Sequence, residues 1–206
     1  KADFRNPWDT TRTLQTFILV PRSLSPRPPH GGEGAVVVRV PIERAVVYTS
    51  VHASLLHELG AADAIAGVCD AKYVYNPVLR ERIDNGSMAD CGSSMAPNIE
   101  RILMLEPEAL LLSAYENSND HNKVAHTGVP IIDCTDYMET SPLGRAEWMR
   151  FYGRLFGCGD VADSLFEVTE RAYLSLKERT ADVACRPAVL TDLIYGQTWS
   201  APGAFS

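Results

Sequence analysis

Hydroxyl, carboxylate and aromatic side chains follow the apolar segments of this chain, at the points where strands of a parallel sheet would end. Ligands of open α/β sheets bind outside the carboxyl ends of the strands, so these positions are candidate ligand contacts. They are Thr49, Ser50 and His52; Asp70, Lys72, Tyr73 and Tyr75; Ser93, Ser94 and Met95; Ser113, Tyr115 and Glu116; Thr135, Asp136 and Tyr137; and Trp199. Aromatic rings with a few hydroxyls suit a large, flat, partly apolar ligand, and we expect roughly a third of the set to touch it.

The histidines raise the question of a metal site. His52 and His57 are five residues apart, which does not place them on one helical face, and His121 and His126 lie in or beside the segment before Gly128. Zinc accepts such nitrogen donors, but neither HxxxH nor HExxH occurs. We therefore favour solvated or structural histidines and assign no metal ligand. A free zinc or manganese ion, or a metal-dependent enzyme using His52, His121 and His126, stays open as the alternative.

Motifs of common catalytic sites are missing. The chain has no GxSxG nucleophile elbow, no GxxxxGK[ST] phosphate loop and no GxGxxG. No two carboxylates are placed by their spacing as an acid/base pair. The sequence thus predicts neither a catalytic residue, nor a cofactor, nor an enzyme.

Composition and charge argue against some classes of binding partner. Hydrophobic residues make up 46% and charged residues 22% of the 206 residues, as in ordinary globular proteins. The net charge of -7 argues against nucleic acid, whose phosphates require a basic patch. No apolar run approaches the roughly 20 residues of a membrane span. The five cysteines are widely spaced, which favours buried thiols and leaves disulfide pairing open.

Element patterns divide the chain into four parts. Apolar runs at residues 17–20 and 35–40 flank a Pro/Gly-rich segment, which predicts an antiparallel β-ribbon within residues 1–44. Apolar strands near residues 45, 65, 109 and 130 then alternate with short helices. The first of these helices has Ser50 as its N-cap and ends at Gly60. This alternation predicts an α/β lobe over residues 45–141, with a parallel sheet covered by helices.

A long helical spine is predicted over residues 142–180. Its first helix has an apolar face that includes Trp148 and Tyr152, and Gly157-Cys-Gly159 interrupts it. A second helix, with Asp160 as N-cap, presents an apolar face at helical spacing, formed by Val161, Leu165, Val168, Ala172 and Leu176. A strand at residues 188–194 then opens a second α/β lobe, which we expect to be incomplete over residues 187–206. Because the chain starts at Lys1, we also expect a trimmed form.

Six short segments carry a family resemblance. They are Val46-Val-Tyr-Thr-Ser50, Ile65-Ala-Gly-Val68, Pro97-Asn-Ile-Glu100, Leu105-Glu-Pro-Glu-Ala-Leu-Leu-Leu112, Gly128-Val-Pro-Ile131 and Tyr195-Gly-Gln-Thr-Trp199. From residue 45 onward the chain resembles periplasmic substrate-binding proteins of ABC importers that carry iron-siderophores, haem and cobalamin. In that family a long helix joins two α/β lobes, and the ligand lies between them. The resemblance implies a lipid-anchored periplasmic or cell-surface protein that passes a metal chelate to a membrane permease, here truncated in its second lobe.

Glu100 has two interpretations. An acid in the first turn of a helix offsets the helix dipole, which contributes about 0.3–1 kcal/mol. In the resembling family, a glutamate at this position contacts basic residues of the permease, and a solvated acid suits that role because it steers encounter without costly burial. The sequence supports both interpretations.

Overall fold

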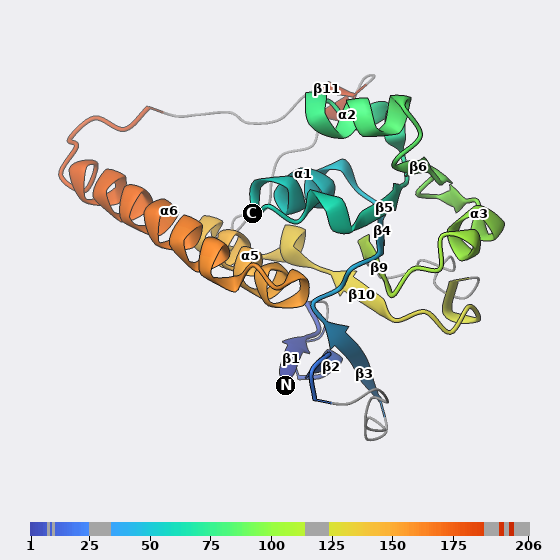
Figure 1. Ribbon diagram of the computed structural model, residues 1–206. Coiled ribbons are helices and arrows are strands. Elements are labelled where there is room, and N and C mark those ends of the chain that lie inside the picture. The colour runs from blue at the N-terminus through green and yellow to red at the C-terminus, as the bar shows by residue number, and fades with distance from the viewer. Residues whose placement is uncertain are drawn as a thin grey trace.

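A five-stranded parallel sheet forms the centre of the computed structural model, which describes residues 1–7, 9, 11–24, 34–113, 124–187, 194–195 and 198–199 (Figure 1). The strand order is β10-β9-β4-β5-β6. The strands are β4 (Ala45–Val47), β5 (Ile65–Val68), β6 (Ala89–Asp90), β9 (Ala109–Ser113) and β10 (Ile131–Cys134), and all neighbours pair in parallel. The central strands β4 and β9 are almost wholly buried, as expected for a sheet covered on both faces. The predicted α/β class is confirmed.

Helices cover the two faces of this sheet. They are α1 (Ser50–Glu58), α2 (Pro77–Asp84), α3 (Ile99–Met104) and α5 (Pro142–Phe156), with the short 3₁₀ turns η1 (Ala62–Ala64), η2 (Ala71–Tyr73) and η3 (Asp136–Met138). The last helix, α6 (Gly159–Arg179), packs on α5. Alternate residues of β4 serve separate cores: Val47 packs in the cluster that contains α1 and α5, whereas Val46 packs with Ile102 of α3. The N-cap of α1 is Thr49 rather than the predicted Ser50, because the Thr49 side chain accepts the hydrogen bond from the backbone N–H of His52.

A separate three-stranded sheet forms the N-terminal part, in the order β1-β2-β3. Its strands are β1 (Ala2–Arg5), β2 (Thr13–Pro21) and β3 (Ala35–Val40). Strand β1 is antiparallel to β2, but β2 and β3 are parallel, so the predicted antiparallel pairing of residues 17–20 with 35–40 was wrong. Residues 22–34 provide the dozen or so residues that a parallel connection requires, and their Pro/Gly content marks a connection without fixing its direction.

The N-terminal sheet is joined to the lobe by aromatic packing and by one glutamine. The ring centroid of Phe4 lies 4.7 Å from that of Trp148 and 4.6 Å from that of Phe151, both on α5. At the outer strand β10, Gln15 Nε2 donates to the Ile131 carbonyl at 2.8 Å, and Gln15 Oε1 accepts from the Asp133 N–H at 3.1 Å. Gln15 therefore satisfies backbone groups of a strand at the edge of the sheet.

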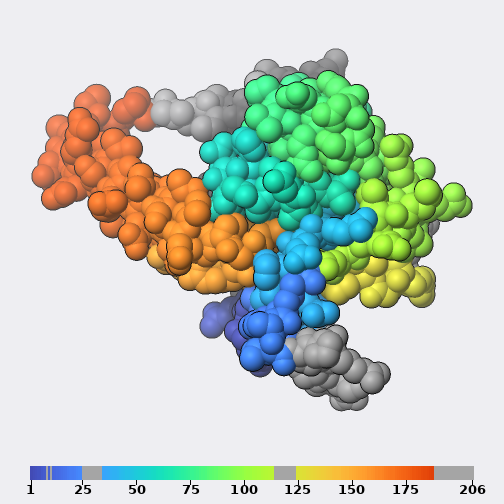
Figure 2. Space-filling view, viewed as in Figure 1, coloured from blue at the N-terminus to red at the C-terminus, as the bar shows by residue number. Residues whose placement is uncertain are grey.

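Helices α5 and α6 pack against each other instead of continuing in line. Gly157 ends α5 in the left-handed conformation with φ of 74°, and Cys158, not the predicted Asp160, is the N-cap of α6. A Cβ atom on Gly153 of α5 would lie only 2.5 Å from the Ala162 Cβ of α6. Helix α6 by itself has 21 residues and spans about 31 Å. Figure 2 shows it projecting from the body of the molecule.

The C-terminal described residues form a small hairpin. Strand β11 (Ile194–Tyr195) pairs antiparallel with β12 (Thr198–Trp199). Most of the strand predicted at residues 188–194 lies outside the described residues. None of the described helices combines the length and apolarity that a membrane span requires.

Candidate ligand-binding edge of the sheet

Four polar segments lie at the carboxyl edge of the parallel sheet. Residues 49–52 follow β4, residues 70–75 follow β5, residues 93–95 come soon after β6, and residues 135–137 follow β10. Parallel strands place their carboxyl ends at one edge, so the structure brings these predicted segments to the same side of the lobe. Tyr115 lies outside the described residues, and so does the side chain of Trp199, whose backbone belongs to β12.

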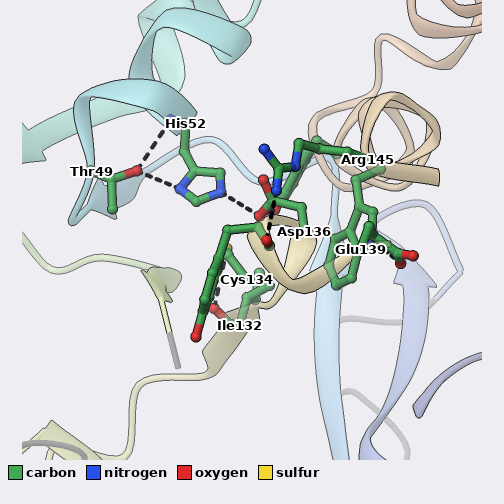
Figure 3. Close-up of polar contacts among 10 residues, drawn as sticks. Thr49, His52, Ile132, Cys134, Asp136, Glu139 and Arg145 are labelled. Carbon is green, nitrogen blue, oxygen red and sulfur yellow. Dashed lines mark hydrogen bonds and ion pairs between the residues drawn. The ribbon is translucent and has the colours of Figure 1, made fainter. Parts of the chain in front are cut away.

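His52 and Asp136 are paired with each other in a buried polar cluster (Figure 3). His52 Nε2 lies 2.8 Å from Asp136 Oδ1, and His52 Nδ1 lies 2.5 Å from Thr49 Oγ1. The side chains of His52 and Asp136 are only 5% and 14% exposed. These hydrogen bonds therefore join α1 to η3, and the polar atoms of His52 and Asp136 already have partners within the protein. The sequence predicted both residues as strand-end groups, but it gave no sign that they would meet.

Tyr152 of α5 completes this cluster, although the sequence pattern placed it only on the apolar face of a helix and not in the site. Its hydroxyl donates to Asp136 Oδ1 at 3.2 Å. Burial by itself raises the pKa of Asp136, but the hydrogen bond and charge of His52 and the Tyr152 hydroxyl outweigh it and hold this pKa below its usual value. Burial, then Cys134 and Asp136, raise the pKa of Tyr152 well above its usual value. The carboxylate thus stays charged, and the phenol keeps the proton that it donates.

The exposed part of the edge carries aromatic and apolar groups. The exposed fractions of Tyr73, Tyr75 and Met95 are 51%, 82% and 68%. The Lys72 ammonium lies 4.7 Å from the centroid of the Tyr73 ring. Exposed aromatic rings beside one cation can stack on a flat ligand and attract an anionic group.

Serines of the predicted set differ in how free they are. The Ser94 hydroxyl donates to the Asp70 carboxylate, so this pair is already satisfied within the protein. Ser93 is exposed and Ser50 half-buried at the first position of α1. Ser50 and Ser93 are therefore better placed than Ser94 to donate to a ligand.

A metal cluster is not assembled among the residues that the structure describes. These contain no group of three or more His, Cys, Asp or Glu side chains that could hold an ion. His126 is exposed, and His121 falls within the masked stretch 114–123. Cys69, Cys91 and Cys134 are buried free thiols, as predicted, whereas Cys185 is exposed.

Glu100 lies on the exposed side of α3, in its first turn. The N-cap Asn98 already accepts a hydrogen bond from the Arg101 N–H at 2.9 Å. This placement suits both dipole compensation and contact with a partner.

Comparison with known proteins gives a consistent result. Residues 45–206 match the model of a family described as periplasmic binding protein. Two uncharacterized lipoproteins of Methanocaldococcus jannaschii are 23% identical over 82% of this chain and 25% identical over 92% of it. The matches cover 42% and 49% of those relatives, so the chain spans about half their length.

Solved structures share the fold at low sequence identity. A periplasmic binding protein from Veillonella parvula has a TM-score of 0.62 at 20% identity, covering 79% of this chain and 54% of that one. A molybdate-binding protein from Haemophilus influenzae gives 0.61 at 20% identity, covering 72% and 52%. A vitamin B12-binding protein from Vibrio cholerae gives 0.56 at 17% identity, covering 69% and 52%. At these identities the likeness shows the fold, with about half of each neighbour matched.

Proposed function

The chain belongs to the periplasmic binding protein family, and from this premise we propose that it is an extracytoplasmic solute-binding protein of an ABC importer. Its ligand in this proposal is a metal chelate of the iron-siderophore, haem or cobalamin type, which it delivers to a membrane permease. A lipid anchor is part of the proposal, since the curated relatives are named lipoproteins.

The exposed tyrosines at the sheet edge are the observation that supports this ligand class most directly. Tyr73 and Tyr75 are 51% and 82% exposed on the segment after β5, where the ligands of α/β sheets bind. Large flat chelates bury aromatic surface and take few hydrogen bonds, whereas a small oxyanion such as molybdate requires several converging donors. The tyrosines therefore favour a chelate over a small anion.

A titration tests the ligand class. The protein is mixed with cyanocobalamin, haemin, a ferric siderophore, molybdate and zinc, and tryptophan fluorescence and the ligand absorption bands are recorded. We expect one chelate to quench fluorescence saturably, and Tyr73→Ala or Tyr75→Ala to weaken it by about two- to tenfold. Tyr173→Ala on α6 is the matched control and should leave the affinity unchanged. Zinc binding without any response to chelates would instead support the free-metal alternative.

Glu100 is the proposed docking contact for the permease. It is exposed on α3, and a rim charge of this kind mainly changes the association rate and its salt dependence. We expect Glu100→Lys to slow association with the permease in detergent, whereas Glu178→Lys at the far end of α6 should not. Equal association rates for both variants would leave Glu100 as a helix-dipole residue only.

A further inference from the structure

The turn η3 is held in place by side chains at each of its polar positions. Asp136 accepts from His52 Nε2 at 2.8 Å and from the Tyr152 hydroxyl at 3.2 Å. The Tyr137 carbonyl accepts from Arg145 Nη2 at 2.7 Å. Glu139, the residue that caps η3, accepts from Trp148 Nε1 at 2.8 Å. Four donors from outside thus hold the segment 136–139, which comprises η3 and its C-cap.

Three of these donors come from one face of α5. Arg145, Trp148 and Tyr152 are three and four residues apart, the spacing that aligns side chains along one side of a helix. Each of them reaches a different residue of the segment 136–139. Figure 3 shows Arg145, Glu139 and Asp136, with the contact from His52 of α1 to Asp136.

Helix α5 packs against neighbouring elements on two sides. Gly153 lets it approach Ala162 of α6 closely, and Trp148 packs on Phe4 of the N-terminal sheet with ring centroids 4.7 Å apart. Because α5 is fixed on two sides, the turn that it holds cannot move separately at low cost. Loops held in this way lose little further freedom when a ligand binds, which favours affinity.

We propose that η3 is a preformed rim of the ligand site, and that Arg145, Trp148, Tyr152 and His52 are positioning residues that keep it in its binding conformation. The ligand-contact part rests on the proposed function, because Tyr137 lies at the carboxyl edge of the sheet. The bracing itself does not depend on which ligand is bound. It also assigns the N-terminal sheet a role, since Phe4 packs against Trp148.

Hydrogen exchange measures the bracing without any ligand. The backbone N–H groups of Met138 and Glu139 close η3 by donating to Thr135 and Asp136. We expect Arg145→Ala, Trp148→Phe and Tyr152→Phe each to speed exchange of these two amides by about three- to tenfold, because each removes one donor. Arg145→Lys should restore much of the protection, since its ammonium can still donate to the Tyr137 carbonyl.

Arg80 provides a matched control. Its guanidinium donates to the Ala71 carbonyl in η2 at 2.9 Å, the same kind of contact as Arg145 makes with η3. Arg80→Ala should loosen residues 71–74 and leave η3 unchanged. Unchanged exchange of η3 in all three α5 variants, or equal loosening by Arg80→Ala, would overturn the proposal.

The ligand part is tested with cyanocobalamin and haemin. Where the wild type binds one of them, Arg145→Ala and Tyr152→Phe should raise the Kd by about three- to tenfold, with recovery in Arg145→Lys. A loosened η3 with an unchanged Kd would show that the turn positions nothing for the ligand. Absence of wild-type binding to the whole chelate panel would count against the proposed function, and the exchange experiment would still decide the bracing.

Discussion

Asp136→Asn is the substitution from which we expect the most informative change in stability. The Asp136 side chain is 14% exposed and accepts hydrogen bonds from His52 and Tyr152. Hydrogen bonds to a charged group contribute about 1.5–3 kcal/mol, and an asparagine oxygen keeps the geometry while losing the charge. We therefore expect the free energy of unfolding to fall by about 2 kcal/mol at pH 7, with an unchanged denaturant m-value, and the Tm to fall by about 4–8 °C.

The lowered pKa of Asp136 determines how this stability difference should change with pH. The pKa of Asp136 is lowered in the folded protein, so the unfolded state binds more protons as the pH falls through the carboxylate range. The stability that the carboxylate contributes is complete above its unfolded pKa of about 3.9 and is lost as the pH falls through the lower folded value. The difference between wild type and variant should accordingly be largest at neutral pH and shrink below about pH 4.

Urea unfolding of both proteins between pH 3 and pH 7 measures this difference. Asp84→Asn is the control: its carboxylate pairs with Arg80 at 2.9 Å, but its side chain is 62% exposed. An exposed ion pair contributes no more than about 1 kcal/mol, so this variant should differ little from wild type. The reasoning would be refuted if the free energies of unfolding of wild type and Asp136→Asn were equal at pH 7, or if their difference grew towards pH 3.

Three further predictions concern packing, the sheet edge and the thiols. Gly153→Ala should lower the free energy of unfolding in urea by about 1–3 kcal/mol, because the new Cβ would lie 2.5 Å from Ala162 Cβ. Gly159→Ala should lower it less, since the nearest atom, at 2.9 Å, is the flexible end of the Arg154 side chain. Gln15→Ala should lower the free energy of unfolding by about 1–2 kcal/mol, since β10 loses two hydrogen bonds. Ellman's reagent should label exposed Cys185 in the native protein and react with Cys69, Cys91 and Cys134 only after unfolding. These three thiols are buried, and burial raises the pKa of each of them, that of Cys91 to about 11, which disfavours the reactive thiolate. Equal labelling of all these thiols in the native state would contradict their burial.

The parallel sheet was predictable because its signals are local. Each strand is a short apolar run bounded by turn residues, and alternation with helices already implies parallel order. The direction of β3 relative to β2 was not predictable in the same way. It depends on the path of residues 22–34, and local composition does not encode that path.

In the candidate site, too, the individual residues were predictable but their contacts were not. His52 and Asp136 were predicted individually because each follows a strand, but they are 84 residues apart and no spacing rule joins them. Trp148 and Tyr152 were assigned correctly to the apolar face of a helix, and both are buried. Their polar atoms were overlooked, although a buried tryptophan or tyrosine usually requires a hydrogen-bond partner. A search for such partners among the predicted strand-end residues would have pointed to η3.

The apolar face of α6 shows the limit of periodicity most clearly. The helical segment was predicted to end at residue 180, and α6 ends at Arg179. The apolar spacing predicts a buried face, yet Val161, Leu165, Val168 and Leu176 are 45%, 38%, 57% and 57% exposed. Only Ala162 and Phe166, on the side towards α5, are buried in this helix. Periodicity thus identifies which side of a helix is suited to burial, but it does not identify the element that covers that side. Among the described residues, none covers this face of α6. Contiguous exposed apolar side chains of this kind usually mark an interaction surface.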